Sequence, residues 1–332
     1  MQELIIGVDL GATKILTGIM DIDGNILDQT WIKTGRKLGS QYVLGQLTDG
    51  IKKIIKDNCS PDDVILGIVV ASPGPLAWPE GIVYDSPNLK WSMVPIKREL
   101  ETRLKVPFIA VEHDTNIAAL GEYYFGYRQQ YQDLIYITVS TGIGGGYILN
   151  GQVYRGARGG AGELGHMVVK PGGERCGCGR QGCLEAIASG TAISREANLL
   201  IQQGKGLGIL AFSQGKEPVS AREVAAACLA GDPEARNIID QAVKHLGLGI
   251  ANLVNLFNPE IIILGGSVAL GLKDYIAEPL ENQVKQQVFR MHADSLQISF
   301  SSIGQENALL GCLARYLIGP STFPRVKADH FI

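Results

Sequence analysis

The sequence has no excess of positive charge and no run of lysine or arginine. Its 30 Lys and Arg residues stand against 33 Asp and Glu, so the formal net charge is −3 at pH 7 and the pI is near 6.0. Proteins that bind nucleic acid usually carry a basic patch that neutralises phosphate groups. We therefore expect no nucleic-acid partner.

Long hydrophobic runs are also missing. The apolar stretches are shorter than the roughly 20 consecutive residues that a membrane-spanning helix needs. The N-terminus leads directly into an apolar strand pattern at residues 4–9, without the charged region and cleavage site of a signal peptide. We expect no membrane partner and a cytoplasmic location.

Cysteine is sparse and unevenly distributed. Of the six cysteines, Cys59, Cys228 and Cys312 stand alone in helix-like surroundings, which favours reduced thiols over a disulfide framework. The other three lie close together in the glycine-rich segment 162–185. This segment therefore calls for a separate explanation.

The segment 162–185 has the pattern H-x9-C-x-C-x4-C, formed by His166, Cys176, Cys178 and Cys183. A closed tetrahedral Zn²⁺ site uses four ligands of these types. Nearby glycines leave the backbone free to fold the sulfurs inward; they occupy positions 172, 173, 177, 179 and 182. The alternative is three reduced thiols and one hydrogen-bonded histidine, because C-x-C is tighter than the familiar C-x-x-C spacing. We favour structural zinc, since four protein ligands leave no open position for a catalytic water.

The chain is long enough, at 332 residues with 45% hydrophobic residues, for about two domains with sizeable cores. Helical patterns occupy residues 40–57, 95–105, 116–125, 184–201, 220–230, 232–256 and 306–317. Strand patterns occupy residues 4–9, 15–20, 26–33, 65–71, 106–111, 134–139, 147–150, 261–264 and 297–303. Residues 204–216 resemble a flexible insertion, and the long loop 72–91, which lacks periodicity, is typical of a functional loop. This mixture predicts an α/β protein.

A first glycine turn separates the strands 4–9 and 15–20. Its Gly11 lets backbone N–H groups come close to a ligand, Thr13 offers a hydroxyl group and Lys14 brings positive charge, as a phosphate contact requires. The turn lacks the strand-to-helix context of a P-loop, so a polar β-turn without a ligand is the alternative.

A second glycine turn, Ser140 to Gly146, leads into another strand rather than a helix, which excludes a Rossmann motif. We favour a hairpin whose turn presents backbone donors to phosphate; the alternative is a plain glycine-rich hairpin. The likeness of the two turns suggests two related hairpin halves that clasp one polyphosphate. The pair Gly265 and Gly266, after strand 261–264, marks a further close approach of backbone to ligand.

The strand 106–111 ends in the sequence Glu-His-Asp-Thr-Asn, residues 112–116, just before a helix. In α/β proteins the ends of strands commonly carry the chemistry. The alternative use of Asp114 is to cap the N-terminus of the helix, a common role of Asp.

Taken together, eight segments resemble the ROK family of sugar kinases and repressors, and within it they are most similar to the bacterial glucokinases. The segments are DLGATK at 9–14, SPGP at 72–75, SPNLKW at 86–91, EHDTNIAALGE at 112–122, STGIGGG at 140–146, GGAGELGH at 159–166, CGCGRQGCLEAIASG at 176–190 and ILGGSVA at 263–269. They occur in family order from residue 1 to about 317.

This resemblance implies an actin-like ATPase (ribonuclease H-like) fold of the α/β class, in which two domains enclose sugar and ATP in an interdomain cleft. We expect residues 1–115 plus 305–332 to form the smaller N-terminal domain and residues 116–304 the larger α/β domain with the zinc loop. The C-terminal helix would return to the smaller domain. The long apolar helix 232–256 leads us to expect a homodimer or higher homo-oligomer.

The resemblance also implies residue roles. Asp114 corresponds to the catalytic base that takes the proton of the sugar hydroxyl group. Sugar contacts are implied for Asn88, His113, Asp114, Glu163, His166 and Glu185. Contacts to ATP are implied for Asp9, Gly11, Thr13 and Lys14, for Thr141, Gly142 and Gly144, and for Gly265 and Gly266. His166 would bind zinc and touch the sugar, which couples the metal loop to the substrate.

The implied reaction is transfer of phosphate from ATP with Mg²⁺ to the 6-hydroxyl group of glucose. Phosphoryl transfer depends mainly on positioning and charge stabilisation, which suits a carboxylate near the nucleophile and amide donors around the phosphates. N-acetylmannosamine, N-acetylglucosamine, fructose and allose are rival sugars, because the same contacts serve several hexoses.

His113 departs from the family pattern, since the kinases usually have asparagine at this position. A neutral imidazole offers one donor and one acceptor, and its charge changes near neutral pH. Some regulatory members have histidine here, so a non-catalytic sugar sensor or repressor is the second hypothesis. Family repressors carry an extra N-terminal helix-turn-helix domain, for which this chain leaves no room, and the first phosphate motif is intact. We therefore expect a kinase.

Overall fold

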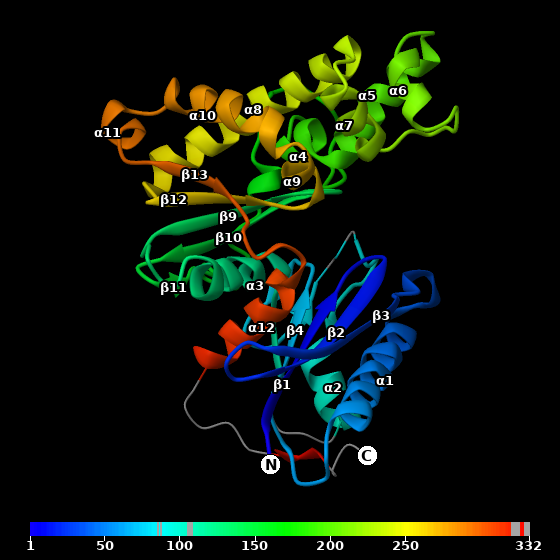
Figure 1. Cartoon of the computed structure of the whole chain (residues 1–332), viewed down its shortest axis with the longest axis vertical. Helices are drawn as coiled ribbons and strands as arrows, with labels where there is room; N and C mark the ends of the chain where they lie inside the picture. The colour runs from blue at the N-terminus through cyan, green and yellow to red at the C-terminus, as the bar shows by residue number, and fades with distance from the viewer. Residues whose placement is uncertain (85, 87, 105–108, 320–325, 329–332) are drawn as a thin grey trace.

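The computed structural model describes residues 1–84, 86, 88–104, 109–319 and 326–328. Within these ranges the chain forms two main β-sheets, of six and five strands, with helices packed on them (Figure 1). The six-stranded sheet contains β1 (Glu3–Leu10), β2 (Lys14–Asp21), β3 (Ile26–Lys33), β4 (Val64–Ser72), β8 (Ile109–His113) and β14 (Val326–Lys327). The five-stranded sheet contains β9 (Leu134–Val139), β10 (Ile143–Leu149), β11 (Gln152–Val153), β12 (Ile261–Gly265) and β13 (Gln297–Phe300).

The two sheets follow the same path. In each sheet, the first three strands form an antiparallel meander, the fourth strand runs parallel to the first, and the fifth runs parallel to the fourth. The six-stranded sheet follows this path through β1, β2, β3, β4 and β8. The five-stranded sheet follows it through β9, β10, β11, β12 and β13. The two glycine turns are alike because each joins the first and second strands of its sheet.

Helices cover the sheets in two groups. The six-stranded half contains α1 (Ser40–Asn58) and α2 (Ile96–Leu104). The five-stranded half contains α4 (Leu184–Ala188), α5 (Gly190–Gln202), α6 (Leu207–Phe212), α7 (Ala221–Leu229), α8 (Pro233–Phe257), α9 (Ser267–Gly271), α10 (Lys273–Lys285) and α11 (Arg290–Ala293). None of the helices described here has both the length and the apolar character that a membrane span requires.

Two further helices, α3 (Asp114–Gly121) and α12 (Asn307–Leu317), lie between the two sheets (Figure 1). α12 packs on β1 and β4, α3 packs on β9 and β10, and the two helices pack on each other. α3 continues as a π-helix over Glu122–Gly126. The turn from β8 to α3 therefore stands where the two halves meet.

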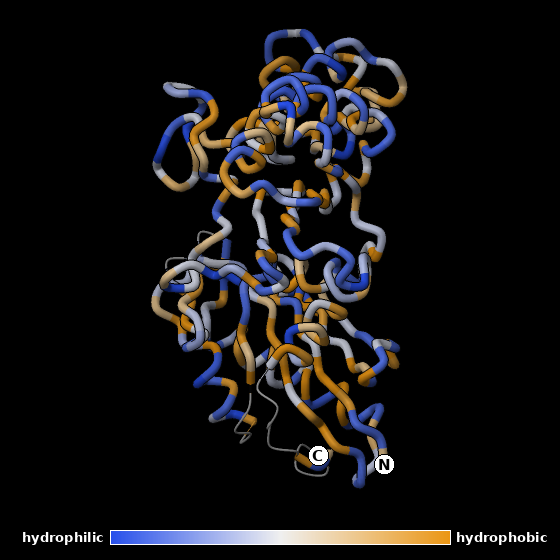
Figure 2. The backbone as a smooth tube through the Cα atoms, turned by 90° about the vertical axis from the view of Figure 1, so that its left-hand side faces the viewer, coloured by the Kyte–Doolittle hydropathy of each residue, from blue (hydrophilic) through white to orange (hydrophobic). Residues whose placement is uncertain are grey.

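The core follows from the hydrophobic pattern. The face of α1 turned to the sheet buries Val43, Leu44, Leu47, Ile51, Ile54 and Ile55. All residues of β4 are buried, because it has neighbours on both edges and helices on its faces. Figure 2 shows long hydrophobic stretches in the lower half of the molecule, which is the six-stranded half in Figure 1. Each buried aliphatic side chain contributes about 1.5–3 kcal/mol to folding.

Most of the predicted elements are confirmed, but some predictions were wrong. The helix predicted over 184–201 is two helices, α4 and α5, which separate at Ser189 because its side chain accepts a hydrogen bond from the N–H of Ala192 and caps α5. The segment 204–216 contains the helix α6. The predicted strand 297–303 ends at Phe300. α10 and α11 were not predicted.

A third, small sheet forms in the loop region after β4. The loop 72–91 is followed by Val94–Pro95, and three short strands from this region form a small sheet: β5 (Leu76–Ala77), β6 (Ile82–Val83) and β7 (Val94–Pro95). Of the predicted strand 106–111, residues 106–108 lie outside the described residues, as do Lys105 of the predicted helix 95–105 and most of the tail beyond 319. The described part of that strand continues to His113.

Candidate functional site

The turn from β8 to α3 presents the predicted base. α3 begins at Asp114 rather than at residue 116, and its N-cap residue is His113, so the interpretation of Asp114 as the cap was wrong. The Asp114 side chain is 40% exposed, and its Oδ1 accepts a hydrogen bond from the backbone N–H of Thr115 at 2.7 Å. A carboxylate held in this way is fixed in direction and still reachable by a substrate.

Four of the predicted sugar contacts form a continuous polar group. Nδ1 of His113 lies 3.1 Å from Oδ1 of Asp114, and Nε2 of the same ring lies 3.7 Å from Oε1 of Glu163. Oε2 of Glu163 lies 3.9 Å from Nε2 of His166. The carboxylates and imidazoles alternate, which offers both donors and acceptors to sugar hydroxyl groups.

The cysteine-rich loop gathers its predicted ligands. The ligand atoms of His166, Cys176, Cys178 and Cys183 all lie within 4.8 Å of one another. Sγ of Cys178 lies 3.7 Å from Sγ of Cys183, and Sγ of Cys176 lies 3.5 Å from Nδ1 of His166. A tetrahedral zinc ion with usual bond lengths separates two sulfurs by about 3.8 Å and a sulfur and a nitrogen by about 3.6 Å. The geometry thus fits zinc bound through Nδ1, which leaves Nε2 facing Glu163.

Glu185 joins the end of this loop to the second glycine turn. Its Oε2 accepts a hydrogen bond from the backbone N–H of Ile143 at 3.0 Å. A Cβ added at Gly142 would collide with the same oxygen, so only glycine permits this approach. The sugar side and the phosphate side of the predicted site therefore meet at one carboxylate.

Asn88 lies apart from the other predicted sugar contacts. Its backbone oxygen accepts a hydrogen bond from Arg36 at 2.8 Å, and its side chain is exposed. Within the described part of the chain, this side chain makes no hydrogen bond to the imidazoles or carboxylates around Asp114.

The first glycine turn lies beside the predicted base. The backbone N–H of Gly11 donates to the oxygen of Lys14 at 2.9 Å and closes the turn, while Thr13 and Lys14 are exposed. Burial and the charge of Asp114 raise the pKa of Asp9 to about 6, although Lys14 opposes the shift. Asp9 and Asp114 thus repel each other, an arrangement that a cation between or beside them would relieve.

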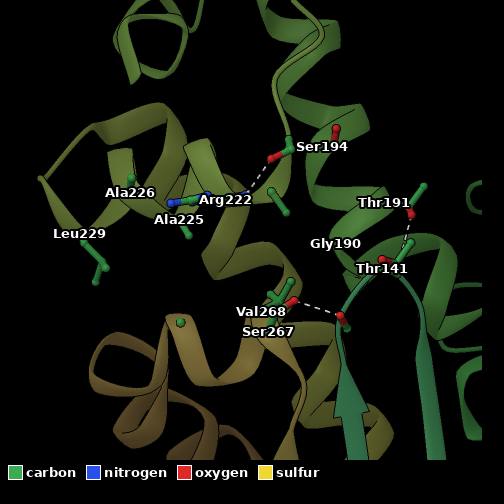
Figure 3. Close-up of a pocket in the computed structure, with 14 residues that line it drawn as sticks. Thr141, Gly190, Thr191, Ser194, Arg222, Ala225, Ala226, Leu229, Ser267 and Val268 are labelled. Carbon is green, nitrogen blue, oxygen red and sulfur yellow. Dashed lines mark hydrogen bonds between the residues drawn. The ribbon is translucent and has the colours of Figure 1, made fainter. Parts of the chain in front are cut away.

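A pocket of about 740 Å³ opens beside the second glycine turn (Figure 3). It is lined by Ser140, Thr141, Gly190, Thr191, Ser194, Ser220, Ala221, Arg222, Ala225, Ala226, Leu229, Ser267, Val268 and Gly271. The hydroxyl group of Thr191 donates to the oxygen of Thr141 at 2.8 Å, which attaches α5 to the turn. Figure 3 shows Arg222 on α7 across the pocket from Val268 and Ser267.

The predicted glycines at 144, 265 and 266 have packing roles in this structure. β10 begins at Ile143, not at residue 147 as predicted, so Gly144 lies inside the strand, where an added Cβ would stand 2.8 Å from Cγ2 of Thr115. At Gly265 an added Cβ would collide with the hydroxyl group of Tyr136, and Gly266 has φ of 88°. Gly144 lets α3 approach β10 closely, and Gly265 and Gly266 let the end of β12 and the start of α9 approach β9.

Sequence reasoning missed a buried charge cluster directly behind the turn from β8 to α3. Glu112, only 1% exposed, accepts hydrogen bonds at Oε1 from Nδ2 of Asn116 at 3.0 Å and at Oε2 from Nε of Arg155 at 2.8 Å. Nε of Arg315 lies 3.4 Å from the same Oε2, and the guanidinium of Arg155 lies 4.4 Å from the ring centre of Trp78. The only signal in the sequence was the position of Glu112 at the end of a strand.

The arrangement agrees with similarity to known proteins. The ROK family model matches residues 5–317. A glucokinase of Halalkalibacterium halodurans is 34% identical over 308 residues, which cover 92% of each chain. A putative xylose repressor of a Caldicellulosiruptor species is 33% identical over 326 residues, which cover 97% of this chain and 80% of the repressor.

A solved structure extends the comparison to three dimensions. The ROK family glucokinase of Streptomyces griseus, in complex with glucose and AMPPNP, is 30% identical and has a TM-score of 0.79, with 95% of this chain and all of that chain covered. The actin-like ATPase fold expected from the sequence is therefore confirmed, and the glucokinase relatives support a sugar kinase. With a family match over almost its whole length, the chain belongs to the ROK family.

Proposed function

We propose that the protein is an ATP-dependent kinase that phosphorylates the 6-hydroxyl group of glucose. The observation that carries the proposal is the reachable carboxylate of Asp114, which lies beside the imidazole of His113 and acts by its charge on Asp9, next to the first glycine turn. Asp114 would take the proton of the attacking hydroxyl group, as general bases do in phosphoryl transfer. Glucose is also the sugar bound in the Streptomyces griseus relative.

The polar residues around Asp114 would orient the sugar. Glu163, His166 and Glu185, together with His113 and Asn88, would accept or donate hydrogen bonds to its hydroxyl groups. A site built from such contacts rejects an analogue that lacks a hydroxyl group more strongly than an apolar pocket does, because its polar groups are then left unpaired. Asn88 would have to approach the sugar from its exposed loop.

The nucleotide would extend from the first turn to the pocket beside the second. Backbone donors near Gly11, Thr13 and Gly142 would face the phosphates with Lys14, Thr141 and Gly144, and Gly265 and Gly266 would support the adenosine. Asp9 is a suitable carboxylate for Mg²⁺, because burial and the charge of Asp114 raise its pKa and a bound cation would offset both effects. Bound Mg²⁺ would neutralise charge on the β- and γ-phosphates.

The remaining parts of the proposal concern structure around the site. Zinc at His166, Cys176, Cys178 and Cys183 would hold the loop that carries Glu163. We propose residues 1–115 plus 305–332 as the smaller domain and 116–304 as the larger, with α3 and α12 at their junction; residues 320–325 and 329–332 lie outside the described residues. A homodimer, or a higher homo-oligomer, is part of the same proposal.

A sugar-sensing regulator is the second candidate. It is favoured by the similarity to a putative xylose repressor and by His113 in place of the asparagine usual in the kinases. Against it stand the intact first glycine turn and the exposed Asp114, which a protein without phosphoryl transfer does not need. Another hexose, such as N-acetylmannosamine, N-acetylglucosamine, fructose or allose, is the alternative within the kinase class.

The test is a coupled assay of ADP release with Mg·ATP and glucose, fructose, allose, mannose and the two N-acetylhexosamines. We expect turnover to be fastest with glucose and to disappear in the Asp114→Asn variant. A faster rate with another hexose would keep the kinase and replace its substrate. Sugar-dependent thermal stabilisation without turnover on any sugar would support the regulator instead.

A further inference from the structure

The imidazole of His113 lies between two carboxylates. Its ring nitrogens lie 3.1 Å from Oδ1 of Asp114 and 3.7 Å from Oε1 of Glu163, on α3 and on the segment before the zinc loop. The His113 side chain is 14% exposed, whereas the two carboxylates are 40% and 42% exposed. The charge of Glu112, its neighbour on β8, also acts on the ring, although Arg155 and Arg315 pair with that carboxylate.

The position of this ring is fixed by its surroundings. A Cβ added at Gly74, in the loop after β4, would collide with Nε2 and Cδ2 of the ring. On the other side, Nδ1 lies 2.7 Å from the hydroxyl oxygen of Thr115. The backbone N–H of Thr115 is closer to Asp114, at 2.7 Å, than to Nδ1, at 3.4 Å. The same N–H therefore has a nearer acceptor in Asp114, and a proton on Nδ1 replaces the long contact of 3.4 Å with donation toward Asp114 and the threonine hydroxyl group.

We propose that His113 is a positively charged positioning residue, which holds the base Asp114 through Nδ1 and the sugar-contacting Glu163 through Nε2. The proposal rests on the proposed kinase function. An imidazolium donates at both nitrogens, whereas an asparagine in this place has neither the charge nor two opposed donors. We call Asp114, His113 and Glu163, held together by the charged ring, the bridge. The geometry of the site then depends on the protonation of the His113 imidazole.

The electrostatic surroundings support a charged ring at neutral pH. Burial disfavours the charged form, but the carboxylates of Asp114, Glu163 and Glu112 together outweigh it and raise the pKa of His113 to about 9. Because the folded-state pKa lies above its ordinary value of 6.5, the stability that the charged ring contributes is fully present below pH 6.5 and is lost, together with the charge, as the pH rises through about 9. Turnover is expected to fall in the same alkaline range.

The first test needs no turnover. In the full-length protein with labelled histidine, the imidazole titration of His113 is followed by NMR and assigned by its loss in His113→Asn. We expect a midpoint near 9 in the wild type and a lower midpoint in both Asp114→Asn and Glu163→Gln. A midpoint near 6.5 in all three proteins overturns the bridge, whether or not the protein is a kinase.

The second test reads the consequence for catalysis. The wild type is expected to lose kcat above about pH 9, and His113→Asn to lack this alkaline decline and to have a kcat about tenfold lower at pH 7. Gly74→Ala keeps the histidine but displaces its ring, so we expect the same loss of kcat while circular dichroism stays unchanged. An unaltered pH profile in His113→Asn contradicts the proposal. Absence of turnover in the wild type rejects the kinase alone, and the NMR titration still decides the bridge.

Discussion

Oε2 of Glu112 accepts a hydrogen bond from Nε of Arg155 at 2.8 Å, and the pair joins the end of β8 to the chain that follows β11. The same oxygen lies 3.4 Å from Nε of Arg315 on α12. Burial lowers the pKa of Arg315, although the charge of Glu112 opposes this shift. One buried carboxylate thus serves two guanidinium groups from separate parts of the fold. Asp114, the first residue of α3, follows Glu112 by two residues in the chain. The position of Asp114 therefore depends on the pair of Glu112 and Arg155.

Glu112→Gln is expected to destabilise the protein strongly. Removal of one partner of a buried ion pair leaves an uncompensated charge and typically costs about 3–5 kcal/mol. Here two arginines, Arg155 and Arg315, would lose their carboxylate. Urea unfolding measures the change. Lys53→Ala provides the matched control, because Lys53 and its partner Asp57 are both exposed and an exposed ion pair contributes little to stability. Equal effects of the two substitutions would contradict the importance of the buried pair.

Asp114→Asn is expected to lower kcat by at least about a hundredfold, because general acid–base catalysis contributes roughly 10²–10⁴. The amide oxygen can still accept the hydrogen bond from Thr115, so the turn and sugar binding should survive. Steady-state ADP release measures kcat, and thermal stabilisation by glucose measures binding. Asp49→Asn, an exposed carboxylate on α1, is the control and should behave as the wild type. Normal turnover in Asp114→Asn would remove the base assignment.

The sequence predicted those features that depend on local pattern. The apolar period of residues 40–57 defined α1 because each turn of that helix repeats the same burial. The spacing of His166 and the three cysteines predicted a cluster whose ligand atoms do lie together. In both cases the relevant residues are near neighbours in the chain or follow a fixed period.

Features that depend on contacts between distant segments were not predictable in this way. Arg155 and Arg315 carry no motif, and only the folded chain brings them to Glu112. The break between α4 and α5 at Ser189 lies within a run of residues with a helical apolar pattern. A serine ends one helix and caps the next only when other contacts hold the capped turn in place, and the sequence does not show those contacts. Gly144 is assigned to the phosphates by the family resemblance, and only the folded chain shows that its missing Cβ also makes room for Thr115.

Loss of zinc is expected to weaken sugar binding. Nδ1 of His166 faces the metal position and Nε2 faces Glu163, so release of the histidine would free the carboxylate that we assign to the sugar. Cys178 is exposed, which makes it accessible to chelators and a suitable site for substitution. We expect Cys178→Ser to lose both bound zinc, measured by elemental analysis, and affinity for glucose, measured as a higher KM.

A cysteine outside the cluster controls for thiol chemistry. Cys59 is half-buried after α1, and Cys59→Ser should retain both metal and sugar affinity. Treatment of the wild type with a chelator should reproduce the Cys178→Ser result, and added zinc should reverse it. A metal-free protein with unchanged KM for glucose would show that the loop does not need zinc to position Glu163.

Arg222→Ala is expected to raise the KM for ATP while kcat at saturating ATP stays close to that of the wild type. Among the described residues that line the 740 Å³ pocket, Arg222 alone carries a charge, and the others are small, hydroxyl-bearing or aliphatic. A guanidinium suits contact with the π-face of a base or with a phosphate. Because the lining of the pocket includes neither Asp114 nor the polar residues around it, loss of the guanidinium removes binding that is common to the ground state and the transition state.

The size of this effect and its specificity decide the nucleotide assignment. Loss of a hydrogen bond to a charged group costs about 1.5–3 kcal/mol, which is roughly a ten- to hundredfold rise in KM. The KM for glucose should stay constant, and Arg290→Ala, an exposed arginine on α11, should change neither constant. If Arg222→Ala instead raised the KM for glucose alone, the pocket would belong to the sugar, and the nucleotide would have to enter from the side of the first glycine turn.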